Sequence, residues 1–172
     1  ISALRGGGQT YLLHLLKRIP KQLHGKIIVL AHKGNQDIFS PYMEQIQLLV
    51  SDFASRSIFH RMFFENFLLK QMLLKYKVRV FFSVSGLVPK WEIEGVRLVS
   101  IFQNQLPFAP SERKRYPYGY MRFKLLLLKF LQIQSLKNSD LCIFLTNYSR
   151  KMIESYVPQH PKQSVVIGHG LN

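Results

Sequence analysis

The sequence predicts an α/β domain that is Rossmann-like and doubly wound, with a mostly parallel sheet and helices on both faces. Short apolar runs such as "IIVL", "VFFSV", "VSIF" and "CIFLT" lack polar alternation, which is typical of strands buried in a parallel sheet. Longer segments with apolar residues at helical spacing separate these runs. A mostly helical fold is the alternative, because the segments 59–77 and 121–139 are strongly apolar, but the separate strand-like runs argue against it.

The first half of the chain is expected to alternate strands and helices. In order, the expected elements are a strand end at 1–4, a glycine turn at 6–8, a helix at 9–19, a strand at 26–31, a loop at 32–37, a weaker strand at 45–50 and a mostly buried helix at 57–77. The helix at 9–19 has its apolar residues on one face and ends at Pro20, which cannot continue a helix. The run at 26–31 is rich in β-branched residues and too short for a stable helix, so it is assigned as a strand.

The second half continues the same alternation. The expected elements are a strand at 78–86 that ends in a Ser/Gly turn, a strand at 96–102, a long loop at 103–120, a helix at 121–139, a strand at 140–146, a short helix at 147–156 and a last strand at 164–167. Three prolines, a glycine and the lack of a period indicate the loop at 103–120, and long ordered loops are often functional. Asn147 is the expected N-cap of the short helix.

The charge is strongly unbalanced, with 24 Lys and Arg residues against 9 Asp and Glu residues and a net charge of +15. Such a field attracts nucleic acid, an anionic membrane face or phosphorylated ligands. The alternative is a surface charge that only keeps the protein in solution. The imbalance comes as much from scarce acidic residues as from abundant basic ones.

The sequence also limits the chemistry that is available. Cys142 is the single cysteine, so neither a disulfide framework nor a cysteine-based metal site can form within one chain, and a reducing compartment is expected. None of the six histidines pairs with another ligand at metal-binding spacing. No apolar run is long enough to predict a transmembrane helix. Because both ends look cut, we expect the 172 residues to be a piece of a longer protein.

Polar residues follow the ends of the predicted strands, where open α/β sheets bind their ligands. They occur at 6–9, at 83–86, and at Gln103 and Asn104. A glycine-rich turn before a helix lets the backbone approach a phosphate, although "GGGQ" matches neither the P-loop nor the G-x-G-x-x-G pattern. The amides suit a hydroxyl-rich ligand because they both donate and accept hydrogen bonds. In the alternative readings the glycines only form a tight turn and the amides only satisfy loop backbone groups.

Four segments together resemble the N-terminal domain of the retaining glycosyltransferases of the GT-B fold, the group 1 or family-4 class. They are "GGGQTYLLHLL", "VRLVSIFQNQLPF", "SLKNSDLCIFLTNYSRKMIESY" and "KQSVVIGHGLN", in the order and at the spacing of that family. The resemblance implies that residues 1–172 form a single Rossmann-like acceptor-side domain. The donor-binding domain of such enzymes is a second, C-terminal domain, which these residues do not include.

The resemblance also implies roles for individual residues. Gly7, Gly8 and Gln9 would face the donor phosphates and the transferred sugar, and Gln103 and Asn104 would be the catalytic residues near the reaction centre. Asn104 stands where many members have histidine, and it cannot act as a base near neutral pH. Ser85 and Arg113 are assigned to acceptor binding. No metal and no other cofactor is expected, since such transfer is generally metal-independent in this fold.

A basic and aromatic stretch, "SERKRYPYGYMRFKLLLLKFLQ", suits an anionic lipid surface. The residues predicted to face the membrane are Lys114, Arg115, Arg122 and Lys129. Such a composition would also suit single-stranded nucleic acid, but many enzymes of the family act on lipid-linked acceptors, so nucleic acid is not the expected partner. The alternative is a buried helix with a solvated charged rim.

The resemblance implies a hexosyltransferase-type enzyme of bacterial cell-surface polysaccharide, lipopolysaccharide or glycolipid synthesis, inactive as this fragment alone. It would transfer a sugar, with retention, from a nucleotide sugar to the hydroxyl of a saccharide or lipid-linked acceptor. We expect it in the cytoplasm, peripheral on the inner face of the plasma membrane. The alternative is a non-catalytic basic α/β module that binds anionic membrane or nucleic acid. A hydrolase or epimerase would need carboxylates at strand ends, which the sequence lacks.

Overall fold

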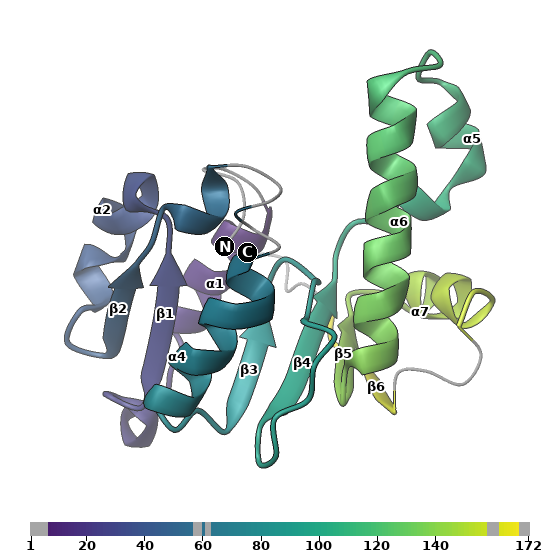
Figure 1. Ribbon diagram of the computed structural model, residues 1–172. Helices are drawn as coiled ribbons and strands as arrows, with labels where there is room; N and C mark the ends of the chain where they lie inside the picture. Colours follow the sequence, from purple (N-terminus) through teal and green to yellow (C-terminus); the bar gives the residue numbers. More distant parts are fainter. Residues whose placement is uncertain (1–6, 57–59, 61–62, 158–161, 169–172) are drawn as a thin grey trace. The chain divides into compact units, whose positions relative to one another are not determined.

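The computed structural model describes residues 7–56, 60, 63–157 and 162–168. The chain divides into two compact units, Ile1–Met72 and Leu73–Asn172, each described here by itself. Every pair of hydrogen-bonded strands in the described residues is parallel, and helices alternate with the strands. The predicted α/β class with parallel sheets, consistent with a Rossmann-like fold, is confirmed (Figure 1). The strands form two sheets, one of two strands and one of four.

The first unit contains helix α1 (Gly7–Leu16) and the two-stranded sheet of β1 (Ile27–Ala31) and β2 (Ile46–Val50). Between the strands the chain forms the short helix α2 (Gln36–Phe39), where the sequence predicted a loop as far as residue 37. Short 3₁₀ helices occupy Lys21–Leu23, Lys33–Asn35, Ser40–Tyr42 and Phe53–Ser55. The core consists of buried side chains from α1, both strands and α2, namely Leu16, Val29, Ala31, Phe39 and Ile46.

The glycines of the opening segment differ from the prediction. Gly7 and Gly8 form the first turn of α1 instead of a separate turn before it. The predicted strand end at 1–4 and Gly6 lie outside the described residues. The sequence placed the start of this helix at Gln9 because glycine is a poor helix former, but a first turn needs little intrinsic propensity.

The segment predicted as a mostly buried helix at 57–77 is less buried than expected. Its described part contains a π-helical turn at Phe64–Leu68, followed by α4 (Leu69–Lys75). The buried side chains are Phe64, Leu69 and Leu73, whereas Phe63, Phe67 and Leu74 are exposed. The segment therefore carries apolar side chains on its exposed side as well as on its packed side.

The second unit contains a four-stranded parallel sheet in the order β3-β4-β5-β6. Its strands are β3 (Val80–Ser83), β4 (Arg97–Phe102), β5 (Leu141–Phe144) and β6 (Gln163–Val166). Each lies within, or one residue outside, the range that the sequence predicts, because each is a short apolar run between clear breakers. The spatial order of the strands follows their order in the chain. Because all three strand pairs are parallel, all four strands end at the same edge of the sheet.

Three helices belong to this unit: α5 (Pro110–Lys114), α6 (Tyr120–Asn138) and α7 (Asn147–Glu154). A 3₁₀ helix, Leu106–Phe108, precedes α5. The prediction of a loop over 103–120 is therefore wrong for Leu106–Phe108 and Pro110–Lys114, whereas 103–105, 109 and 115–119 are neither helix nor strand. Both helical segments have proline in their first turn, where a missing N–H does no harm. The last helix is capped by Thr146 and not by Asn147, since Thr146 Oγ1 accepts a hydrogen bond from Ser149 N at 3.0 Å.

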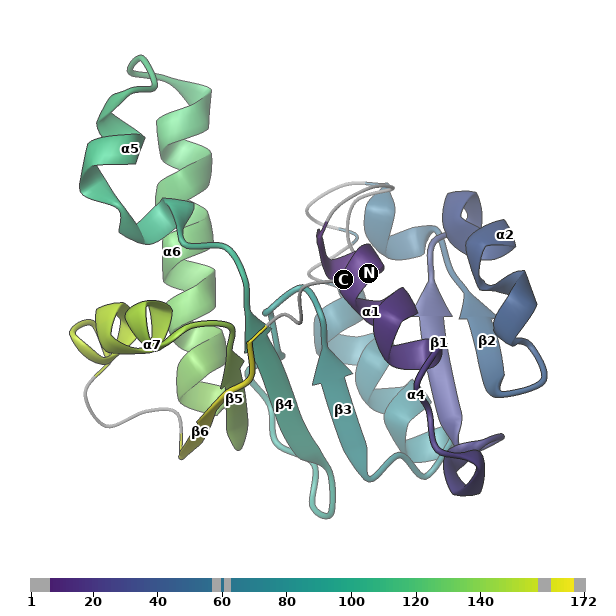
Figure 2. The same cartoon turned by 180° about the vertical axis from the view of Figure 1, so that it is seen from behind.

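The core of the second unit lies around β4, β5, α6 and α7. Its buried side chains are Phe102, Phe108, Leu136, Cys142, Phe144 and Ile153. The C-terminal end of α6 is joined to the sheet by a buried hydrogen bond between the hydroxyls of its C-cap residue, Ser139, and Ser100, whose Oγ atoms lie 2.8 Å apart. By contrast, α5 and the first turns of α6 extend beyond the ends of the strands (Figures 1 and 2).

Candidate functional site

The carboxyl ends of β3 and β4 bring two groups of predicted site residues to one edge of the four-stranded sheet. The strands are parallel neighbours, with Ser83 opposite Ser100. Ser85 follows β3, and Gln103 follows β4 directly. Because the strands run in the same direction, both residues leave the sheet at its carboxyl edge, the usual ligand edge of open α/β sheets.

The turn after β3 presses closely on β4. Gly86 has a φ of +74°, and a Cβ built at this position would lie 2.7 Å from the carbonyl oxygen of Ile101. Its N–H donates to Ser83 O at 3.2 Å and closes the turn. Any larger residue would therefore displace either the turn or the backbone of β4.

The direction of the hydrogen bonds made by the serine hydroxyls of this turn can be assigned. Ser83 Oγ donates to Leu87 O at 2.6 Å and lies 3.1 Å from Ser85 Oγ. A hydroxyl has a single hydrogen, so Ser85 must be the donor to Ser83. Ser85 Oγ then retains only acceptor capacity, which suits a ligand group that donates a hydrogen bond.

Gln103 carries an unpaired polar atom at the same edge. Its Nε2 is buried and has no hydrogen-bond partner among the described residues, although the residue as a whole is only half-buried. An amide nitrogen that loses water without gaining a partner costs about 1–3 kcal/mol. Gln103 can therefore gain a hydrogen bond from a bound ligand.

Asn104 is used differently. Its Oδ1 accepts a hydrogen bond from Leu106 N at 3.1 Å, and its side chain is exposed. This contact is an Asx turn that starts the 3₁₀ helix Leu106–Phe108. Of the two amides after β4, Gln103 has unused hydrogen-bonding capacity toward the sheet edge, whereas Asn104 shapes the following turn.

The remaining predicted site residues belong to other elements of the chain. Gly7, Gly8 and Gln9 form the start of α1 in the first unit, whereas Ser85 and Gln103 belong to the second. The first N–H groups of a helix have no partner within the helix and point out of its N-terminus. Arg113 lies in the last turn of α5 and is half-buried.

Most of the residues predicted to face a membrane are engaged with the protein. Arg122 Nε donates to Tyr116 O at 2.6 Å and its Nη2 donates to Lys114 O at 2.9 Å. The Lys129 ammonium lies 4.0 Å from the ring centroid of Tyr156, toward α7. Arg115 pairs with Glu112 at 3.0 Å but remains exposed, as does Lys114. Spacing alone could not reveal the inward contacts of Arg122 and Lys129.

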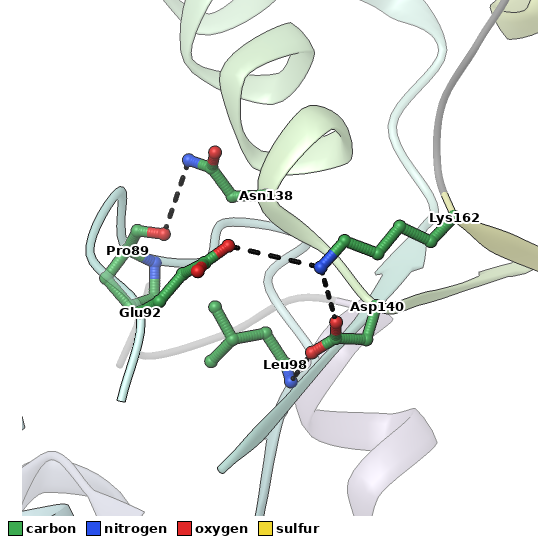
Figure 3. Close-up of polar contacts among 6 residues, drawn as sticks. All are labelled: Pro89, Glu92, Leu98, Asn138, Asp140 and Lys162. Atoms are coloured by element: carbon green, nitrogen blue, oxygen red, sulfur yellow. Dashed lines mark hydrogen bonds and ion pairs between the residues drawn. The ribbon is translucent and has the colours of Figure 1, made fainter. Parts of the chain in front are cut away.

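A polar network lies at the opposite edge of the sheet, where the strands begin (Figure 3). It was not predicted from the sequence. Asp140 Oδ2 accepts a hydrogen bond from Leu98 N at 2.8 Å, and its Oδ1 lies 3.0 Å from Lys162 Nζ. Glu92 approaches the same ammonium at 4.0 Å. Partial burial acts to raise the pKa of the Asp140 carboxyl, but the Leu98 N–H, Lys162 and Arg97 outweigh it and the pKa is lowered. The network ties β4, β5 and the start of β6 together, and its groups are paired.

A second missed pair joins the carboxyl ends of β1 and β2. His32 Nε2 lies 3.4 Å from Asp52 Oδ1, while His32 Nδ1 accepts from Gly34 N at 2.9 Å. Both ring nitrogens are therefore occupied by the protein. The pair connects two strand ends and leaves neither nitrogen free to act as a base on a ligand.

Other chemistry finds little support in the described residues. Burial raises the pKa of the Cys142 thiol to about 12, so this side chain is not a nucleophile near neutral pH. Across residues 7–56, 60, 63–157 and 162–168 there is no group of three His, Cys, Asp or Glu side chains that could hold a metal ion. In the same residues, no helix has the length and apolar character needed to cross a bilayer.

No protein-family model, curated protein or solved structure matches the chain.

Proposed function

We propose that residues 1–172 are the acceptor-side domain of a retaining sugar transferase. The reaction would move a sugar from a nucleotide sugar to an acceptor hydroxyl. The observation that carries the proposal is the unpaired amide of Gln103 at the carboxyl edge of a parallel sheet. The resemblance of four ordered segments to the GT-B glycosyltransferases supplies the reaction class, and the parallel α/β architecture agrees with it.

In this proposal the sheet edge orients the acceptor. Gln103 donates a hydrogen bond, and Ser85 accepts one, so a sugar hydroxyl, which does both, is the matching ligand group. Neither an amide nor this serine takes a proton near neutral pH. The proton of the attacking hydroxyl would therefore pass to a group outside this pair, and Gln103 would position the acceptor instead of acting as a base.

The donor side is assigned from the resemblance. Gly7 and Gly8 would leave room for the donor phosphates at the N-terminus of α1, where the helix dipole favours negative charge. Gln9 would lie near the transferred sugar. The donor would be held chiefly by a domain outside residues 1–172, and no metal is required. We place the protein in the cytoplasm, where nucleotide sugars are supplied.

The test is saccharide binding. It is measured by ligand-observed NMR with residues 1–172 and a panel of free glycosides and oligosaccharides. Gln103→Met keeps the size of the side chain and removes the unpaired amide, whereas Gln105→Met makes the same change two residues further on. We expect Gln103→Met to weaken binding at least about tenfold and Gln105→Met to leave it unchanged. The ligand-free Gln103→Met chain should also be more stable by about 1 kcal/mol, because a buried unpaired amide is gone.

The outcome separates the two function classes. Saccharide binding that depends on Gln103 supports the transferase domain. Binding that survives Gln103→Met would refute the assigned role of the amide. A folded chain that binds none of the saccharides but binds an anionic surface would favour the non-catalytic module. Sugar transfer by residues 1–172 alone would contradict the assignment of the donor site to another domain.

A further inference from the structure

The turn between α5 and α6 combines exposed aromatic side chains with an excess of positive charge. We define residues 114–124 as the α5–α6 tip. It contains Lys114, Arg115, Arg122 and Lys124 and no acidic residue. Tyr118 is 91% exposed, Tyr120 75% and Phe123 66%. Three large aromatic side chains at such exposure are unusual on a surface that meets only water.

Arg122 holds the tip in shape from within. Its guanidinium donates to two backbone carbonyls of the turn and lies 3.8 Å from the ring centroid of Tyr118. Gly119 has a φ of +146°, a conformation almost restricted to glycine, and it precedes the first residue of α6. The aromatic side chains are therefore exposed on an ordered turn, and their exposure does not follow from a loose loop.

The position of the tip leaves it accessible within its unit. The buried residues of α6 are Leu125, Gln132, Ser135 and Leu136, so its packed face begins after the tip. In both views the tip lies at the end of α6 away from the four-stranded sheet (Figures 1 and 2). Lys129, which the sequence grouped with the tip residues, contacts the Tyr156 ring and does not belong to it.

We propose that the α5–α6 tip inserts Tyr118, Tyr120 and Phe123 into the interface of an anionic lipid bilayer. Tyrosine is favoured at the headgroup level because its ring is apolar and its hydroxyl is polar. Lys114, Arg115 and Lys124 supply the charge that anionic lipids attract, and residues 114–124 contain no carboxylate, although Arg115 pairs with the neighbouring Glu112. This docking does not depend on the proposed sugar transfer.

Charge and shape favour lipid over nucleic acid. Single-stranded nucleic acid binds in basic grooves whose aromatic side chains provide flat stacking platforms. Here the aromatic side chains lie on a projecting turn, and the guanidinium nearest to them is already bonded to the backbone. Exposed aromatic side chains with basic neighbours on a projecting turn match a bilayer interface better than a nucleic-acid groove.

The experiment measures cosedimentation of residues 1–172 with vesicles of phosphatidylcholine alone or mixed with phosphatidylglycerol. We expect binding only to the anionic vesicles. Tyr120→Ala/Phe123→Ala should weaken it at least about tenfold, and Lys114→Gln/Lys124→Gln about thirtyfold. The matched controls are Tyr148→Ala, which removes another strongly exposed tyrosine, and Lys17→Gln/Lys26→Gln, which removes two exposed lysines of the first unit. Both controls should bind nearly as the unchanged chain does.

Insertion has its own readout. Tryptophan placed at position 120 should shift its fluorescence to the blue on anionic vesicles, whereas tryptophan at position 148 should not. Trp91 gives the same background in both variants. Equal binding to neutral and anionic vesicles would overturn the proposal, as would an equal loss in the control variants. Tip variants that lose binding to a single-stranded oligonucleotide but keep vesicle binding would assign the tip to nucleic acid instead.

Discussion

Alanine at position 86 should destabilise the Leu73–Asn172 unit far more than a glycine-to-alanine change usually does. Two effects add at this position. The φ of +74° costs a residue with a Cβ about 1–2 kcal/mol. The new methyl would also lie 2.7 Å from Ile101 O, a backbone atom of β4 that cannot rotate away. Overpacking of this kind costs about 1–3 kcal/mol, so we expect a loss of about 2–5 kcal/mol.

Gly95 provides the matched control. Its φ is +78°, close to that of Gly86, but a Cβ at this position meets nothing within 4 Å. Gly95→Ala therefore carries the conformational cost alone, about 1–2 kcal/mol. The difference between the two variants isolates the close approach of the β3 turn to β4.

Urea unfolding followed by the fluorescence of Trp91 measures both variants, because this single tryptophan lies in the second unit. The midpoint should fall further for Gly86→Ala than for Gly95→Ala, with similar slopes. Equal losses for the two variants, within about 0.5 kcal/mol, would refute the close approach and with it the rigid placement of Ser85 beside β4.

Two further changes test the edges of the same sheet. Thr146→Ala should lower the free energy of unfolding by about 1 kcal/mol in the same urea assay, because it removes the cap of α7, whereas Asn147→Ala should change it by less than about 0.5 kcal/mol. Asp140→Asn should lower stability by about 1 kcal/mol at neutral pH, because the Leu98 amide loses a charged acceptor. A lowered pKa stabilises the folded chain above the unfolded-state pKa, and this contribution disappears as the pH falls through the folded-state pKa. The urea midpoints of the Asp140→Asn variant and the unchanged chain should therefore converge once the pH falls below the lowered pKa that the Asp140 carboxyl has in the folded chain.

The strands were the most predictable part of the fold. The sequence places strands at 26–31 and 96–102, and the structure has them at Ile27–Ala31 and Arg97–Phe102. Each is a short run of β-branched and aromatic residues that could bury two faces, and a parallel sheet is the arrangement that buries both. Composition and length were sufficient because no competing local structure suits such a run.

The segment at 103–120 shows what was overlooked. It was predicted to be a loop because it lacks an apolar period, but a helix of one turn needs no period. Pro110 at the first position, Glu112 in the first turn, and Arg113 and Lys114 in the last turn are the start and stop signals of a short helix. Those signals were present in the sequence and outweighed the proline content.

Side-chain partners could not be predicted in the same way. The seven-residue spacing of Arg122 and Lys129 put both on one side of a helix, and a shared outward role was the natural expectation. Their actual partners are two backbone carbonyls that precede α6 and the ring of Tyr156, just after the end of α7, which only the folded chain brings near. By contrast, the place of Ser85 and Gln103 after the carboxyl ends of β3 and β4 could be predicted from the sequence, since strand ends follow from strand positions.

The two edges of the four-stranded sheet differ in a way that stability alone does not explain. At one edge, Asp140 bonds to Leu98 and to Lys162, and each contact favours the fold. At the other edge, Gln103 leaves a buried amide nitrogen unpaired, which lowers the stability that the same chain could reach. A cost of this kind persists where a site must stay polar for a ligand. Because it lies at the carboxyl edge, where parallel sheets bind their ligands, we infer that this edge, and not the Asp140 network, is the one shaped by function.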